Sequence, residues 1–251
     1  MPNSSYPAYT PSHGYMTESI QQKYIAASIK DKTLPDNAHR MPDIVALNAS
    51  KDQSKPIQFW QLYSVLGQKR IVRIVQNFYH RVYRDEPWFS SIFARIGDTS
   101  HHVRTQSAMW LDVMGGGFKY HGAEFRLNFH HQHNAIELMN KKGAERWIRL
   151  MVQTLDDTAD YMTDDPRVRI SLNTFLAYFM KKYTADFGFQ TNTMFGRTNS
   201  KIMQKINLRN MLDTEIEALS ELELRAALTG RGFSLDENTP LQELVQKAQR
   251  L

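Results

Sequence analysis

Apolar residues between positions 57 and 187 recur every three or four residues, which is the spacing of one face of a helix. No stretch alternates apolar and polar residues as a half-buried strand does. The pattern therefore predicts an all-α domain over about residues 58–188. The apolar residues that predict its helices lie, in chain order, between Ile71 and Val82, Trp88 and Phe93, Met109 and Val113, Trp147 and Leu155, and Val168 and Tyr183.

Prolines, glycines and capping residues separate these stretches. The first helix is expected to end at Asp85-Glu86-Pro87, because the residue before a proline disfavours the α conformation. Asp98 or Thr99 can cap the start of the helix that carries His102. Glycines 115–117 are expected to stop that helix, and Asp164-Asp165-Pro166 breaks the chain before the last core helix.

Both ends of the chain differ in composition from this domain. Residues 1–57 are rich in Ser, Pro, Asn and Asp, with one weak helical pattern from Thr17 to Lys30. We expect this arm to be mostly disordered or draped over the core, so that residues 1–55 are dispensable for ligand binding.

Residues 189–251 are expected to form a basic linker and a small helical extension. The linker leads into a short stretch without acidic residues, Arg197 to Arg209. Two helices are then predicted, Leu212–Leu228 and Leu241–Arg250, joined by a loop that contains glycine.

Charge and cysteine content exclude several kinds of site. The net charge of +5 is spread along the chain, with 6 basic and 5 acidic residues in 1–57, 17 and 13 in 58–189, and 8 and 8 in 190–251. This distribution does not favour nucleic-acid binding. The chain has no cysteine, which excludes disulfides, thiolate metal sites, iron–sulfur clusters and thioether-linked haem.

The sequence also predicts where the protein resides. No run of about 18 apolar residues indicates a transmembrane helix. The amino-terminal residues have neither a basic start nor an apolar stretch, so they do not resemble a secretory signal. A cytoplasmic location and no membrane association are therefore expected.

Two histidine clusters flank the glycine triplet. One is His101-His102, and the other comprises His130, His131 and His133. Two facing helices could hold an iron porphyrin, which needs one strong axial nitrogen, an apolar slot and a controlled opposite face. Other interpretations are a zinc or copper site at His130 and His133, and histidines that are simply solvated or buried in the core.

The order and spacing of several residues resemble the truncated haemoglobins, the short globins with a two-over-two helix arrangement. The similarity is greatest to their third group, with features of the second, and covers about residues 62–186. Phe93 lies 14 residues after Tyr79, His102 lies eight before Trp110, and Trp147 lies 14 after His133. The residues that carry the resemblance are Asn77 to Val82, Asp85, Phe93, His102, Gln106, Trp110, glycines 115–117, Tyr120, the second histidine cluster and Trp147.

The resemblance implies non-covalent haem b and a role for each matching residue. Tyr79 resembles the distal tyrosine that donates a hydrogen bond to a ligand. His102 resembles the distal gate histidine, and Gln106, one turn further on, is expected to line the same face. Phe93 resembles the aromatic residue that wedges the macrocycle. Trp147 resembles the tryptophan that covers the proximal side, and Trp110 is expected to contact the cofactor as well.

The axial ligand has three candidates. His133 fits the spacing to Trp147 and shares a helical face with Phe125, Phe129 and Ile136, so Phe129 and Ile136 are expected to pack on the porphyrin. His131 fits a competing frame with Leu127 four residues before it, and His130 is the third candidate.

The functions that the resemblance implies all use this pocket. The first is binding of O2, NO or CO at ferrous iron, for oxygen transport, nitric oxide detoxification or sensing. A second is a nitric oxide dioxygenase or peroxidase served by a separate reductase, since no flavin or nicotinamide fingerprint is present. A third is a haem-free interaction scaffold. Residues 222–248 resemble the SAP-like helix–loop–helix module, which implies nucleic-acid contact, but their balanced charges favour a plain amphipathic helical pair whose partner is unknown.

Overall fold

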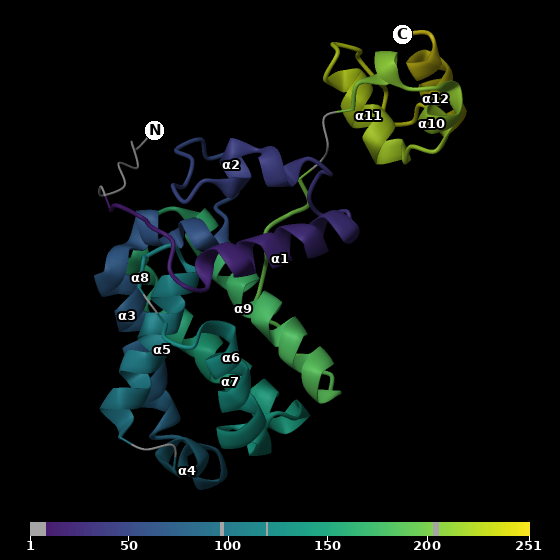
Figure 1. Ribbon diagram of the computed structural model, residues 1–251. Coiled ribbons are helices and arrows are strands. Elements are labelled where there is room, and N and C mark those ends of the chain that lie inside the picture. Colours follow the sequence, from purple (N-terminus) through teal and green to yellow (C-terminus); the bar gives the residue numbers. More distant parts are fainter. Residues whose placement is uncertain (1–8, 96–97, 119, 203–205) are drawn as a thin grey trace. The chain divides into compact units, whose positions relative to one another are not determined.

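The computed structural model describes residues 9–95, 98–118, 120–202 and 206–251, which form two compact units (Figure 1). The larger unit comprises the chain up to Lys30 together with Asn37–Ser200, and the smaller comprises Asp31–Asp36 with Lys201–Leu251. Within the described ranges, β-structure is limited to an isolated bridge between Ser12 and Gly116. The all-α fold class is therefore confirmed. The α-helices of the larger unit are α1 (Thr17–Lys30), α2 (Pro42–Val45), α3 (Leu62–Val82), α4 (Pro87–Arg95), α5 (Thr99–Val113), α6 (Ala123–Phe129), α7 (Lys141–Asp157), α8 (Ala159–Met162) and α9 (Pro166–Phe187).

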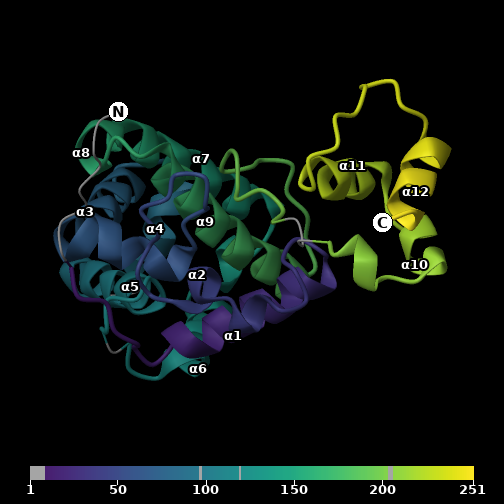
Figure 2. The same cartoon turned by 90° about the horizontal axis from the view of Figure 1, so that it is seen from above.

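Four long helices, α3, α5, α7 and α9, form the core of the larger unit (Figure 2). Helix α3 packs most extensively on α5 and α7, and also contacts α9. The apolar faces that the sequence pattern predicted are the ones that face inward. Their fully buried side chains include Ile74, Phe78, Ile148, Leu172 and Phe175.

The predicted helix boundaries are confirmed where a cap or a breaker specifies them. Asp98 accepts hydrogen bonds from the amides of Ser100 and His101 and so caps α5. Asp165 accepts from the amide of Arg167 and caps α9, and Pro166 follows at the first helical position. These side chains satisfy amides that have no partner within the helix.

The histidine-rich connection between α5 and α7 is irregular. After α6 ends at Phe129, residues His130–Asn134 form a turn of π-helix, in which the amide of Ala135 donates to the carbonyl of His130 (3.0 Å). A 3₁₀ turn, Ile136–Leu138, leads on to α7. The connection is therefore not one straight helix, and the turns shift the register of the residues that follow.

Residues 9–30 and 37–57 of the amino-terminal arm lie on the core, which is the second of the two arrangements expected for the arm. Helix α1 lies against the other helices of the larger unit (Figures 1 and 2). Its side chains Ile20 and Ile25 are buried. Asp112 of α5 is fully buried and accepts hydrogen bonds from the amides of Tyr15 (2.9 Å), Met16 (2.9 Å) and Thr17 (3.2 Å). A carboxylate from the core thus caps the helix of the arm.

The second half of the arm is held by polar side chains beneath it. Trp60 Nε1 donates to Ile44 O (2.8 Å), and Gln61 Nε2 donates to Asp43 O and Ala46 O. Arg167 of α9 donates to three carbonyls of residues 50–55. Because these buried donors would lose their partners without the arm, the expectation that residues 1–55 are dispensable no longer follows.

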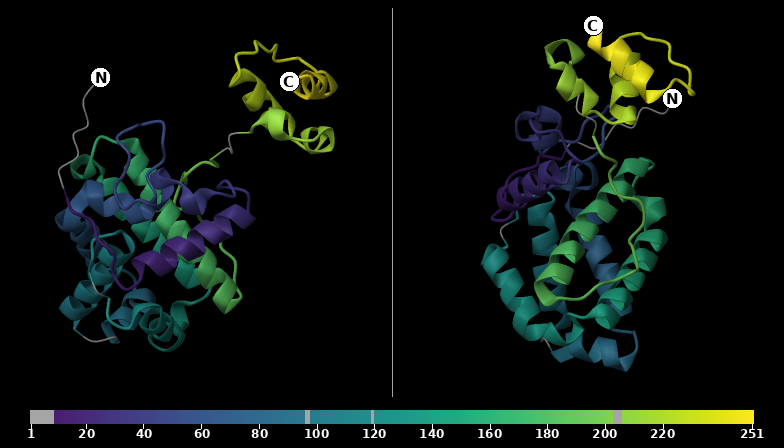
Figure 3. Two further views of the ribbon diagram at one scale, coloured as in Figure 1. Left: turned by 45° about the horizontal axis from the view of Figure 1, so that its top comes forward. Right: turned by 90° about the vertical axis from the view of Figure 1, so that its right-hand side faces the viewer.

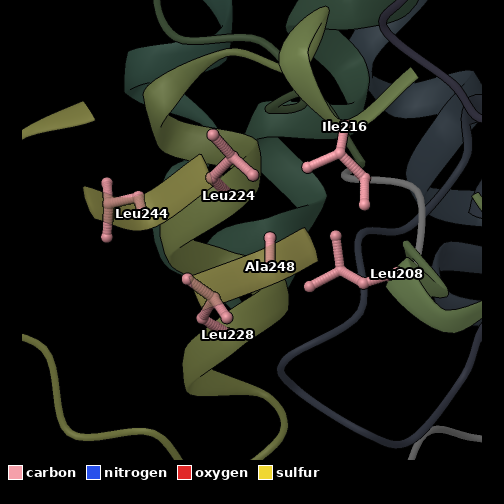
Figure 4. Close-up of a cluster of buried hydrophobic side chains, with 6 residues drawn as sticks. All are labelled: Leu208, Ile216, Leu224, Leu228, Leu244 and Ala248. Atoms are coloured by element: carbon pink, nitrogen blue, oxygen red, sulfur yellow. The ribbon is translucent and has the colours of Figure 1, made fainter. Parts of the chain in front are cut away.

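The smaller unit has its own apolar core (Figure 4). Its α-helices are α10 (Asp213–Glu217), α11 (Glu221–Thr229) and α12 (Leu241–Gln249). The helix predicted over residues 212–228 is in fact two, because Ser220 leaves the helical conformation and its hydroxyl caps α11 by accepting from Glu223 N. The second predicted helix is confirmed as α12. The buried core residues are Leu208, Ile216, Leu224, Leu228, Leu244 and Ala248.

The basic side chains of the smaller unit are used largely within it. Arg225 pairs with Glu221 and donates to the carbonyls of Asp236, Glu237 and Thr239, which fixes the loop between α11 and α12. Residues 201–251 carry 7 basic and 8 acidic side chains. Neither observation adds support for a nucleic-acid contact.

None of the helices in the described part of the chain combines the length and the apolar character needed to cross a bilayer.

Candidate functional site

A largely apolar cavity lies between the four core helices and the α6–π-turn connection. About 950 Å³ of space lies between its lining side chains, and this figure includes space that is open to solvent. Phe78, Phe89, Trp110, Trp147 and Phe175 line it together with methionines and leucines. The polar lining is sparse: Tyr79, Gln106, His130, His131 and Tyr183.

His131 enters this cavity from the π-turn with a fixed orientation. Its Nδ1 donates to the carbonyl of Leu127 (2.8 Å), four residues earlier, and its ring lies 4.3 Å from that of Tyr183. Burial, with a further contribution from His130, lowers the pKa of His131 to about 3. The imidazole is therefore neutral at physiological pH, with Nδ1 occupied and Nε2 left as the nitrogen that can act as a ligand.

His133 lies outside the cavity. It is exposed, its Nδ1 donates to Phe129 O (3.0 Å), and its ring stacks on that of Phe129 (4.1 Å). Phe129 and Ile136, both expected to contact a cofactor, are 48% and 46% exposed. The structure thus brings His131 and His130 to the cavity, but not His133, Phe129 or Ile136.

The opposite wall comes from α3, α4 and α5. Tyr79 and Gln106 line the cavity together with Phe93, whose ring is 6.0 Å from that of Tyr79. Burial raises the pKa of the Tyr79 phenol, so its hydroxyl remains protonated and can donate a hydrogen bond. These residues were all expected at the site, and the structure brings them together.

His102 is not among the residues that line the cavity, but its ring packs against side chains that do. Only 5% of it is exposed, and its ring packs edge-on against Tyr79 (4.7 Å) and lies 5.7 Å from His130. Its Nε2 is buried without a hydrogen-bond partner among the described residues. Burial, then the neighbouring His130 and His101, lowers the pKa of His102 to about 4.

Trp147 is positioned by packing and by a neighbouring ion pair. Its ring lies 4.8 Å from Phe78, next to Tyr79 in α3, and 6.0 Å from Phe195. Arg146, the preceding residue, pairs through its guanidinium with Asp85 at the end of α3 (Nε–Oδ2, 2.7 Å). This pair lowers the pKa of Asp85 and ties α7 to α3.

Sequence reasoning assigned some lining residues only to the core. Phe175, Phe179 and Tyr183 follow one another at intervals of four in α9 and line the cavity. Their helical spacing was visible in the sequence, but it is equally typical of a helix packed on protein. Phe189 also lines the cavity, although it lies in the segment expected to be a linker.

Direct binding of a bare metal ion was one interpretation of the histidine clusters. Within the described ranges, no three histidine, aspartate or glutamate side chains converge in a way that could hold such an ion. The cavity instead offers one fixed imidazole, a mainly apolar interior and donors on the opposite wall.

Comparison with known proteins identifies the class of this domain. Residues 61–181 match the family described as bacterial-like globin. Over 122 residues the chain is 32% identical to a group 2 truncated hemoglobin 3-1 of Lotus japonicus, an alignment that covers 47% of this chain and 70% of that protein. It is 28% identical over 120 residues to a two-on-two hemoglobin-3 of Arabidopsis thaliana, covering 47% and 67%. No solved structure matches.

The chain therefore belongs to the bacterial-like, or truncated, globin family. Membership of this family implies haem binding and diatomic gas ligands in general. The matched region contains the cavity walls formed by α3, α5 and α7, and all the histidines of the two clusters.

The buried histidines predict a pH dependence of the haem-free chain. Because His102 titrates near 4 in the folded state and near 6.5 when unfolded, the unfolded state binds more protons between these values. Stability should therefore fall as pH decreases from about 6.5 to about 4, by up to about 1.4 kcal/mol per pH unit for this histidine. Chemical denaturation at a series of pH values should show a shallower fall for His102→Gln. An identical slope in the variant would contradict the assignment.

Proposed function

We propose that the cavity binds haem b without covalent attachment, with His131 as the axial ligand, and that the opposite wall receives O2, NO or CO. The observation that carries this proposal is the geometry of His131: a partly buried, neutral imidazole with Nδ1 held by Leu127 O and its other nitrogen available inside an apolar cavity. Haem iron in globins takes such a proximal histidine.

The residues that line the cavity fit haem. A flat aromatic macrocycle needs apolar side chains on both faces, and Phe93, Leu127 and Trp147 are among those that line the cavity. The chain has no cysteine, so the cofactor would be held by coordination and packing alone. When bound, ferrous haem supplies an open coordination position for a diatomic gas.

The roles of the remaining polar residues follow from their positions. The Leu127 carbonyl fixes the tautomer and the ring orientation of His131, as an outer partner does for metal-ligating histidines generally. Tyr79 and Gln106 present donors to a small ligand on the far side of the cavity. His102 packs against Tyr79 and His130, which line the cavity, and in this proposal it restricts the entry of water and ligand between the two walls.

The hydrogen-bond donors on the opposite wall are expected to slow the release of bound O2. Tyr79→Phe and Gln106→Leu each remove one donor while keeping most of the side-chain volume. A hydrogen bond has a net value of about 0.5–1.5 kcal/mol, so O2 should dissociate about two- to tenfold faster from each variant. Stopped-flow measurement of O2 release from the ferrous protein gives this rate.

Two results would contradict this part of the account. One is an O2 dissociation rate that is unchanged in both variants, which would remove Tyr79 and Gln106 from contact with the ligand. The other is a wild-type ferrous protein that forms no complex with O2 or CO, which would contradict gas binding itself. Ser91→Ala, an exposed change in α4, is the control and should leave the rate unchanged.

A further inference from the structure

The chain that follows the last core helix returns along that helix. After the left-handed glycine that ends α9, residues 189–200, here called the return segment, run back beside it (Figure 3). Asn173 Nδ2 donates to Arg197 O (2.9 Å), and the amide of Asn199 donates to Thr174 Oγ1 (2.8 Å). Because these partners lie within α9, the segment is fixed to the core up to Asn199, just before the smaller unit begins at Lys201.

Two aromatic side chains of the return segment point inward. Phe189 lines the cavity itself. Phe195 is only 4% exposed, and its ring meets that of Trp147 edge-on. The neighbouring Met194 is 77% exposed, so the segment presents one residue to solvent and the next to the core.

The backbone after Phe195 supports this arrangement. Gly196 has φ of +115°, a conformation that L side chains rarely adopt. A Cβ at this position would also lie 3.0 Å from Asn173 Nδ2, the group that holds the segment to α9. The glycine thus permits both the turn and the close approach that place Phe195 against Trp147.

We infer that the return segment is a wall of the proposed haem cavity, in which Phe189 is a lining residue and Phe195 is a positioning residue that acts through Trp147. This inference rests on the proposed function. The match to the globin family ends at residue 181, so the wall is supplied from outside the matched region.

The physical reason lies in how Trp147 is confined. Its indole is packed between Phe78 on α3 and Phe195 on the return segment. Removal of the Phe195 ring leaves a void beside the indole, and the surroundings of such a void relax only partly. Trp147 then gains freedom, and water gains easier access to this side of the cavity.

The test uses the full chain and three variants. Phe195→Ala removes the ring, Phe195→Leu retains apolar volume, and Met194→Ala is the matched control one residue away. Haem loss to an excess of haem-free myoglobin should be about fivefold faster or more for Phe195→Ala, intermediate for Phe195→Leu, and unchanged for Met194→Ala. The C–O stretching band of the ferrous CO complex, which reports the field around the ligand, should shift only in the Phe195 variants.

A measurement without haem separates this inference from the proposed function. The indole N–H resonance of Trp147 in the haem-free chain, assigned with Trp147→Phe, should move in Phe195→Ala and stay in place in Met194→Ala. If that resonance, the haem-loss rate and the C–O band are all the same in Phe195→Ala as in wild type, the inference is overturned. If the resonance moves but wild type takes up no haem, the contact stands and the haem proposal fails.

Discussion

Replacing His131 with glycine should abolish the five-coordinate ferrous haem spectrum and lower haem affinity by at least about 100-fold, since changes to the outer partners of metal ligands alone cost about 10–100-fold. The variant removes the nitrogen that Leu127 O orients into the cavity. Imidazole added from solution should partly restore the spectrum, because the space left by the side chain can admit it. Absorption spectra of the ferrous protein, with and without imidazole, are the measurement.

His133, a member of the same histidine cluster, provides the matched control. His133→Gly should retain the spectrum and the affinity, because His133 is exposed and bonded to Phe129 O. His102 packs against Tyr79 on the opposite wall and could supply a nitrogen from that side, so the test is repeated in a His102→Ala background. Loss of haem in His133→Gly, with retention in His131→Gly, would restore His133 as the ligand and overturn the assignment.

Replacing Asp112 with alanine should lower the free energy of unfolding by at least about 3 kcal/mol. Its carboxylate is fully buried and accepts from the amides of Tyr15, Met16, Thr17 and Tyr120. Alanine would leave these donors without a partner, and each unsatisfied buried donor costs about 1–3 kcal/mol. Thermal unfolding should accordingly occur about 6–12 °C lower.

Two further variants distinguish the cap from a general loss of charge. Asp112→Asn keeps one acceptor oxygen and should lose less stability than Asp112→Ala. Asp43→Ala, which breaks an exposed pair with Lys55 in the same arm, should cost less than about 1 kcal/mol. Equal losses for Asp112→Ala and Asp43→Ala would contradict a specific role for the buried carboxylate.

Much of the fold could be predicted because it depends on local signals. The aspartate caps of α5 and α9, the proline after Asp165 and the glycine triplet act within a few residues of the helix end that they define. The helix periodicity places Phe78 and Phe175 inside. These signals do not depend on which other part of the chain packs against the helix.

The cavity-facing side of the histidine connection could not be predicted in the same way. Phe125, Phe129 and His133 do share a face. Because these side chains are aromatic, that face was expected to point into the haem cavity. In the structure this face is outward, with Phe125 80% exposed, whereas Leu127 and His131 lie on the face that lines the cavity. Periodicity identifies a common face, but neighbouring helices decide whether it is covered.

The bonds that hold the arm and the return segment to the core could not be predicted, for a related reason. Their polar composition resembles that of linkers, yet both are fixed by long-range bonds to buried groups: Asp112 binds the arm, and Asn173 binds the return segment. Such bonds join residues far apart in sequence, so no local pattern reveals them. Tyr79, Phe93, Gln106 and Trp147, which line the cavity, could be named from the sequence because the resemblance to globins supplied their tertiary context, and their roles toward haem stay predictions.

The most direct test of the central claim is the resonance Raman spectrum of the ferrous wild-type chain after reconstitution with haem. The account predicts a five-coordinate haem with an iron–histidine stretching band that is lost in His131→Gly and retained in His133→Gly. Failure of wild type to take up haem, or an iron–histidine band that survives in His131→Gly, would contradict it.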